Sequence, residues 1–214
     1  MRKIILGLSL CIALAILGLG VSGCKGKSED KIDSSIISTG ANVSQEAQQE
    51  NDNLDKKSYA GLEDVFSDTK TITPNGKYMM MVFGANGCPY CEMLKKDIKD
   101  TPELKNYIKD HFSAYYINMS YSKIHDFKVG TKADPKEIKV STSQLSQMYD
   151  IRPTPTIVFS DADGKTILEF PGYVRAKQFI KILEFINNGE WKKAKDQKQL
   201  NQLLQEYVMN ASHS

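Results

Sequence analysis

Two cysteines, Cys88 and Cys91, stand three residues apart in the stretch GCPYCEML. Such a pair can help to hold a zinc ion, close a structural loop, or alternate between a dithiol and a disulfide. A zinc site needs four ligands, but the chain has one such pair, and His111, His125 and His213 follow no zinc-binding spacing. A purely structural disulfide across so short a loop would constrain the unfolded chain very little. The pattern therefore favours a redox pair and no metal.

The residues around the pair predict how each thiol behaves. After Cys88 the spacing is helical, with Cys91, Leu94 and Ile98 on one apolar face. Cys88 would then stand at the helix N-terminus, where unpaired backbone N–H groups and the helix dipole stabilise a thiolate. Pro89 suits the first turn, because the N–H that proline lacks would have no partner there. We therefore expect Cys88 to be the nucleophile and the more buried Cys91 to be the resolving thiol.

Apolar segments on both sides of the pair predict the elements that must position it. Period and flanking turn residues indicate strands over 77–84, 112–118, 155–160 and 165–170. Helical spacing marks segments near 59–66, 88–98, 141–150, 179–186 and 200–208. The run Met79-Met80-Met81 lies in the first strand, where consecutive side chains face opposite sides, so a core role is favoured over a metal site.

Two stretches together resemble the thioredoxin superfamily. MVFGANGCPYCEMLKKDI resembles its active-site strand and helix, and YDIRPTPTIVFSDADGKTILEFPGY resembles its cis-proline loop, the following hairpin and a late glycine, Gly172. The resemblance covers roughly residues 58–188 and implies an α/β, thioredoxin-like fold with a central mixed β-sheet flanked by helices. It further implies that Pro155 is cis and packs against the active-site disulfide, and that the backbone of Thr154 pairs with an extended client peptide.

The dipeptide between the cysteines, Pro89-Tyr90, resembles that of glutaredoxins, whose redox potentials are intermediate within the family. Two features depart from plain thioredoxins. Val82 stands where they bury an acid, which leaves water or Glu92 as the proton carrier for the resolving cysteine. The first cysteine and the cis-proline are 67 residues apart, and we interpret the excess, about 119–140, as a polar inserted loop. Exported reductases of the ResA, CcmG and SoxW-like branch carry an insert near that place.

The first residues predict export. MRK, an uncharged run over Ile4–Val21 and the ending VSGC indicate a signal peptide at 1–23. The ending resembles the lipobox of bacterial lipoproteins, which implies cleavage before Cys24 and lipidation of its thiol; the alternative is an uncleaved anchor over Ile4–Val21. The chain would then lie on the periplasmic face of the inner or outer bacterial membrane, or on the extracellular face of a cell with one membrane. Residues 24–57 have little to bury, so a lipidated N-terminus and disordered linker are expected.

Behind the linker we expect a thioredoxin-like domain at 58–189 and a C-terminal amphipathic helix and tail at 190–214. The apolar stripe of that helix must be covered; we expect it to pack on its own domain in a monomer, and the alternative is a second copy. The chain has 28 basic and 26 acidic residues. Loss of Arg2 and Lys3 with the signal would leave a balanced charge, so no nucleic-acid partner is indicated.

Three functions stay open. The leading one is a membrane-anchored, extracytoplasmic thiol–disulfide oxidoreductase with no cofactor besides the Cys88–Cys91 pair. It would reduce or isomerise disulfides in exported proteins, apocytochrome c among them, and draw electrons from a membrane donor. The alternatives are a DsbA-like disulfide oxidase and a non-catalytic, thioredoxin-like lipoprotein that binds a peptide or metal. The short insert disfavours the first alternative, and the intact CxxC and cis-proline motifs disfavour the second.

Overall fold

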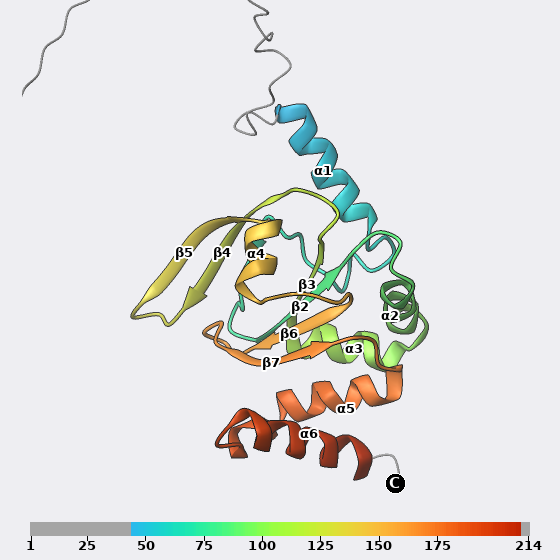
Figure 1. Cartoon of the computed structure of the whole chain (residues 1–214), viewed down its shortest axis with the longest axis vertical. Helices are drawn as coiled ribbons and strands as arrows, with labels where there is room; N and C mark the ends of the chain where they lie inside the picture. Colours follow the sequence, from blue (N-terminus) through green and yellow to red (C-terminus); the bar gives the residue numbers. More distant parts are fainter. Residues whose placement is uncertain (1–43, 211–214) are drawn as a thin grey trace, which may run out of the picture. The chain divides into compact units, whose positions relative to one another are not determined.

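The computed structural model describes residues 44–210 (Figure 1). Its elements in chain order are α1 (Gln45–Lys57), β1 (Thr71–Ile72), β2 (Tyr78–Gly84), α2 (Pro89–Asp100), α3 (Pro102–His111), β3 (Phe112–Asn118), β4 (Ile124–Gly130), β5 (Pro135–Ser141), α4 (Thr142–Met148), β6 (Thr156–Ser160), β7 (Thr166–Pro171), α5 (Ala176–Asn187), the 3-10 helix η1 (Glu190–Lys193) and α6 (Gln197–Asn210). The central sheet has the order β3-β2-β6-β7, with β2 parallel to β3 and antiparallel to β6. The predicted mixed α/β fold is confirmed.

Strand β2 supplies side chains to both faces of this sheet. Met80 and Val82 belong to the apolar cluster beneath α2, α3 and α5, whereas Met79, Met81 and Phe83 belong to the cluster on the other face. All five side chains are fully buried. The strand is apolar throughout because it is covered on both faces, and the core role predicted for the methionines is confirmed.

The second apolar cluster is covered by a hairpin that the sequence analysis missed. Residues 119–140 were expected to form an inserted loop, but β4 and β5 pair as antiparallel strands, and β1 joins β4 in parallel. His125, Phe127 and Val140 point inward and are buried. The prediction was wrong because only every second residue of a half-buried strand faces a core, so the hairpin looks polar as a segment.

Helix α1 also corrects an expectation. Residues 45–57 were assigned to a disordered linker, but they form a helix within the same compact unit as the rest of the described chain. Ser44 caps the helix, since its hydroxyl accepts a hydrogen bond from the Ala47 N–H at 3.2 Å. Only Asp55 of α1 is buried, so the helix attaches through a polar side chain rather than an apolar stripe. The predicted signal peptide and lipidation site lie outside the described residues.

Residues 59–66 were expected to be helical and instead form a series of turns. Their spacing nevertheless identified buried side chains, because Tyr59, Leu62, Val65 and Phe66 all belong to the core cluster on the α2 face. Tyr59 and Phe66 meet edge to face, with ring centroids 6.0 Å apart. The apolar side chains of this segment are therefore buried as their spacing predicted, but its backbone is not helical.

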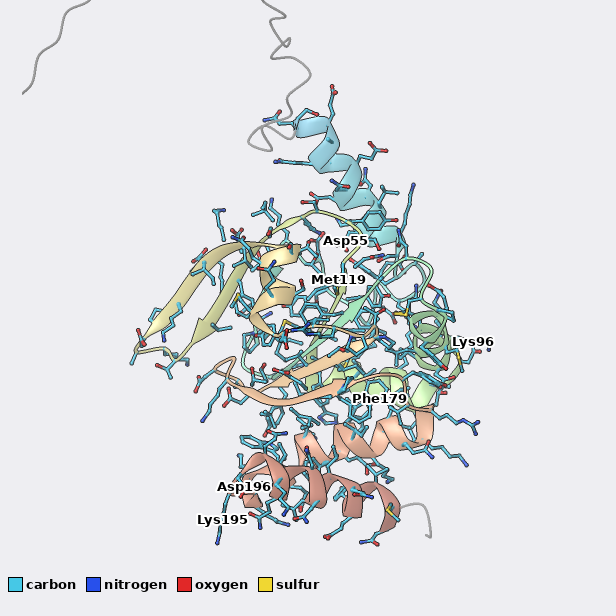
Figure 2. All side chains as sticks on the ribbon, in the orientation of Figure 1. Asp55, Lys96, Met119, Phe179, Lys195 and Asp196 are labelled. Atoms are coloured by element: carbon cyan, nitrogen blue, oxygen red, sulfur yellow. A yellow bond between two sulfur atoms is a disulfide. The ribbon has the colours of Figure 1, made fainter. Side chains whose placement is uncertain are left out.

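Helix α6 lies on α5, which itself covers the central sheet through buried residues such as Phe179 (Figure 2). Leu200 and Leu204 of α6 are buried, and Tyr207 meets Phe185 of α5 edge to face at 5.6 Å between ring centroids. The apolar stripe is thus covered within the chain. Over residues 44–210, no helix combines the length and apolar character needed to cross a membrane.

Leu204→Ala tests how much this packing contributes to stability. Leu204 is buried against the core, so the change should lower the free energy of unfolding by about 2–3 kcal/mol. Urea denaturation of both proteins would measure it. Leu203→Ala makes the same chemical change at a partly exposed neighbour and should cost less. Equal losses for the two variants would mean that α6 is not seated on α5.

His125 makes stability depend on pH. Its Nδ1 atom donates to the Thr69 carbonyl oxygen at 2.7 Å, and its Nε2 atom lies 3.0 Å from the Thr142 hydroxyl. Burial lowers the pKa of His125, and the nearby Lys123 charge acts in the same direction. The folded state therefore keeps this histidine neutral at a pH where the unfolded chain has already bound a proton.

As the pH falls below about 6.5, the unfolded state gains this proton first, so the free energy of unfolding should decrease. One histidine contributes at most about 1.4 kcal/mol per pH unit. His125→Asn, whose amide can still donate to Thr69, should flatten the dependence between pH 6.5 and 5. Urea titrations at several pH values would measure it. Parallel curves for the variant and the wild type would contradict the prediction.

Candidate active site

The redox pair lies at the N-terminus of α2, as the sequence predicted. Cys88 is the N-cap residue, Pro89 occupies the first turn, and Gly87 turns the chain into the helix with a φ of +68°, which favours glycine. The backbone N–H of Cys91 points at the Cys88 Sγ atom, 3.1 Å away. A thiolate at Cys88 would accept this hydrogen bond and face the positive end of the helix dipole.

Cys88 and Cys91 form a disulfide, with Cα atoms 5.3 Å apart. Cys88 keeps 8% of its surface exposed, whereas Cys91 is fully buried on the apolar face of α2 beside Leu94. Cys88 is thus the more accessible cysteine of the pair. This difference supports Cys88 as the attacking thiol, an assignment that stays a prediction.

The cis-proline loop faces the pair from the other half of the domain. The Thr154–Pro155 peptide bond is cis, as predicted. The Thr154 carbonyl oxygen lies 3.4 Å from the Cys88 Sγ atom, and the Gly172 N–H donates to the Pro155 carbonyl oxygen at 2.7 Å. The structure thus brings together the two motifs that are far apart in the sequence. Gly172 fixes the loop through its hydrogen bond to Pro155.

An exposed aromatic and apolar rim lies around α2. Tyr90 and Met93 are 58% and 44% exposed. The Tyr90 ring stacks on Tyr173 at 6.2 Å between centroids. The Tyr173 hydroxyl donates to Asp97 at 2.7 Å, and this hydrogen bond raises the pKa of Tyr173. Neither Tyr173 nor Asp97 was predicted as a site residue; the only signals were the spacing of Asp97 one turn after Met93 and the place of Tyr173 after the late glycine.

Glu92, the side chain considered as a proton carrier, has another partner, and a valine occupies the position of the thioredoxin acid. Val82, at the position where thioredoxins bury an acid, is fully buried and pairs in register with Tyr116 of β3. Glu92 is mostly exposed and forms an ion pair with Lys95 at 2.8 Å. Lys95 also donates to the Ser58 carbonyl oxygen at 2.6 Å. Neither Val82 nor Glu92 therefore offers Cys91 a buried base.

Within residues 44–210, no three His, Cys, Asp or Glu side chains are arranged to hold a metal ion. The geometry of the disulfide and the cis-proline loop supports the chemistry of the cysteine pair. A disulfide at a helix N-terminus, facing a cis-proline loop and an exposed apolar rim, can exchange with thiols of another protein.

Comparisons with known proteins agree with this geometry. The family model of the thioredoxin-like domain matches residues 65–187. A thioredoxin-fold protein from Helicobacter pylori is 58% identical, with 74% of this chain and 99% of that chain covered and a TM-score of 0.73.

Probable nucleoredoxin 3 from Oryza sativa subsp. japonica is 28% identical over an alignment of 96 residues that covers 42% of this chain; the chain spans only 20% of that curated relative's length. The family match runs from before β1 to the end of α5, and it contains the whole central sheet and both halves of the site. On that match, the chain belongs to the family of thioredoxin-like domains.

Proposed function

We propose that this protein is a lipid-anchored, extracytoplasmic thiol–disulfide oxidoreductase that reduces or isomerises disulfides in exported proteins. The observation that carries the proposal is the Cys88 sulfur, which lies at a helix N-terminus, 3.4 Å from the carbonyl oxygen of Thr154. The anchor and the location rest on the sequence of residues 1–24 alone. Apocytochrome c is one client class to test.

The reaction would start from the reduced pair. The Cys88 thiolate attacks one sulfur of a client disulfide, the client S–S bond breaks, and the departing client thiolate takes a proton from water. Cys91, once deprotonated, then attacks the Cys88 sulfur of the mixed disulfide. The client leaves as a dithiol with two more electrons, and Cys88 and Cys91 are left as a disulfide.

Isomerisation would use the same first step. A second client thiolate, rather than Cys91, attacks the mixed disulfide, which frees Cys88 and leaves a new client disulfide with no net transfer of electrons. Net reduction instead requires a two-electron donor to restore the dithiol, and we assign this role to a membrane protein with its own thiol pair. No cofactor besides the cysteine pair is needed for either reaction.

The surroundings of the pair support an extended peptide as the client. Thr154 is partly exposed beside Cys88, and its backbone would pair there with the backbone of a client strand. Tyr90, Met93 and Tyr173 would contact apolar client side chains next to the reacting cysteine. Such contacts recognise unfolded or partly folded segments rather than one sequence.

The fold between β3 and α4 favours reduction or isomerisation over a DsbA-like oxidase. That segment is a β-hairpin, whereas the oxidase reading calls for a large helical domain there. The disulfide and the facing cis-proline loop also disfavour a non-catalytic binding protein. The apolar stripe of α6 is covered by α5 of the same chain. We therefore propose that the protein works as a monomer, without a nucleic-acid partner.

Cys91→Ser should trap clients as mixed disulfides, because Cys88 can still attack and the resolving thiol is missing. Cys88→Ser should trap almost none, because the remaining thiol is buried. Non-reducing gels and mass spectrometry of the exported fraction would compare the two variants. Equal trapping by both variants would contradict the assignment of Cys88 as the nucleophile and Cys91 as the resolving thiol. The absence of trapping by either variant would contradict the proposed oxidoreductase function.

The direction of electron flow can be measured in cells. Rapid acid quenching followed by alkylation distinguishes the dithiol from the disulfide form of Cys88 and Cys91. A reductase or isomerase should be mostly reduced, because its donor keeps the pair ready to attack client disulfides. A mostly oxidised pair would overturn this direction and indicate a disulfide oxidase.

A further inference from the structure

The loop that leads to Cys88 is held by the segment that follows β3. Asn86, two residues before Cys88, donates from its backbone N–H to the Ser120 hydroxyl at 2.9 Å and from Nδ2 to the Tyr121 hydroxyl at 2.9 Å. Its Oδ1 atom accepts from the Asn118 amide at 2.8 Å. All three partners lie within four consecutive residues, so the path of the chain into α2 depends on this segment.

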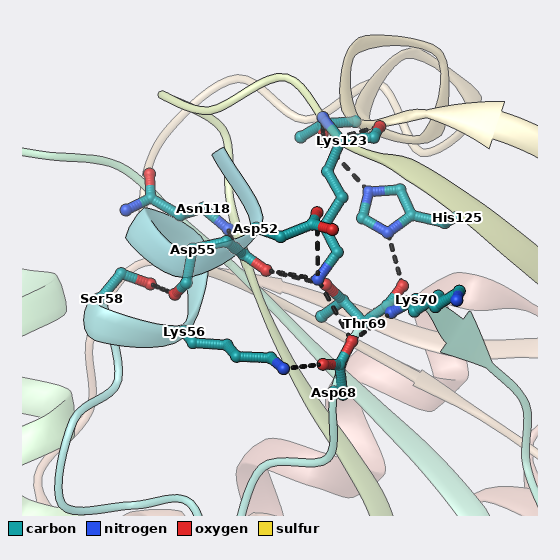
Figure 3. Close-up of polar contacts among 11 residues, drawn as sticks. Asp52, Asp55, Lys56, Ser58, Asp68, Thr69, Lys70, Asn118, Lys123 and His125 are labelled. Atoms are coloured by element: carbon teal, nitrogen blue, oxygen red, sulfur yellow. Dashed lines mark hydrogen bonds and ion pairs between the residues drawn. The ribbon is translucent and has the colours of Figure 1, made fainter. Parts of the chain in front are cut away.

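One carboxylate of α1 binds both ends of the segment 118–123 (Figure 3). The Asp55 Oδ1 atom accepts from the Asn118 N–H at 3.4 Å, and its Oδ2 atom accepts from the Lys123 ammonium at 3.2 Å. Oδ2 also accepts from the Thr69 hydroxyl at 2.8 Å. Asp55 and Lys123 are only 3% and 5% exposed. Both charges of this pair are therefore almost completely removed from water.

Lys123 has a second carboxylate at the same distance. The Oδ1 atom of Asp68 also lies 3.2 Å from the Lys123 ammonium. Asp68 additionally binds the Lys56 ammonium and accepts a hydrogen bond from the Lys70 N–H. Burial alone would raise the pKa of Asp68, but hydrogen bonds from Lys56 and Lys70 and the Lys123 charge outweigh it and lower the pKa to about 2. Asp68 is thus an ionised partner of Lys123, but unlike Asp55 it does not also bind Asn118, the residue that contacts Asn86.

We propose that Asp55 is a positioning residue for the redox site, so that its hydrogen bonds to the segment 118–123 set the reactivity of Cys88. The inference rests on the proposed thiol chemistry of Cys88. Asp55 fixes the segment 118–123, this segment fixes Asn86, and Asn86 fixes the chain that places Cys88 at the α2 N-terminus. A looser loop would move the Cys88 thiolate away from the Cys91 N–H and would slow its attack at neutral pH.

The test compares the purified full-length wild type with Asp55→Asn, Asn86→Ala and Asp68→Asn. After reduction, the rate of iodoacetamide reaction with Cys88 is followed from pH 4 to 9. Asp55→Asn and Asn86→Ala should shift the profile to higher pH and lower the rate at pH 6 at least threefold. Asp68→Asn should keep the wild-type profile even if it melts at a lower temperature, because it weakens the same lysine site without releasing Asn86.

A purely structural role of Asp55 would lower the melting temperature and leave the pH profile unchanged, and that result would overturn the proposal. If Asp55→Asn does not fold, the double variant Asp55→Asn/Lys123→Met removes both buried charges and should show the same shift. An Asp68→Asn profile that moves as far as the Asp55→Asn profile would also overturn it. If the rate of iodoacetamide reaction with wild-type Cys88 did not rise as the thiol ionises, that result would instead contradict the proposed function, and this inference with it.

Discussion

The antiparallel pairing of β2 with β6 is the constraint on which the site depends. The chain runs out of β2 toward the cysteine pair and into β6 from the cis-proline loop. Because the two strands run in opposite directions, the end of one and the start of the other meet at the same edge of the sheet, with Phe83 paired to Thr156. A slip of one residue would turn every β2 side chain to the wrong face and would separate Cys88 from Thr154.

Burial on both faces of the sheet fixes that register. On one face, helices α2, α3 and α5 cover the core, and on the other face the β4–β5 hairpin and α4 cover it. The hairpin is therefore part of the scaffold and not an appendage of it. Its His125 and the neighbouring Lys123–Asp55 pair form a polar layer above the apolar cluster, where each charged or hydrogen-bonding group has a partner.

The sequence predicted those elements and residues whose local residue pattern matches their burial in the fold. Strands β2, β3 and β6 could be predicted because their apolar runs are buried on both faces, and Cys88 and Pro155 because their motifs carry strong local constraints. Helix α1 could not be predicted, because ion pairs of Asp55 and Lys56 near its last turn, rather than an apolar stripe, attach it. The contacts of Asn86 with Ser120 and Tyr121 join two polar loops, and neither loop has a periodicity that would reveal the other.

The shape of α1 has a mechanical consequence. The helix is bound near its last turn, at Asp55, and the rest of it projects away from the body of the domain (Figure 1). Thirteen helical residues span about 20 Å at the rise of an α-helix. Any chain that precedes Ser44 is thus joined to the domain through a stiff strut. Under the proposed anchoring, such a strut would restrict the directions in which the disulfide faces, and with them the client encounters open to it.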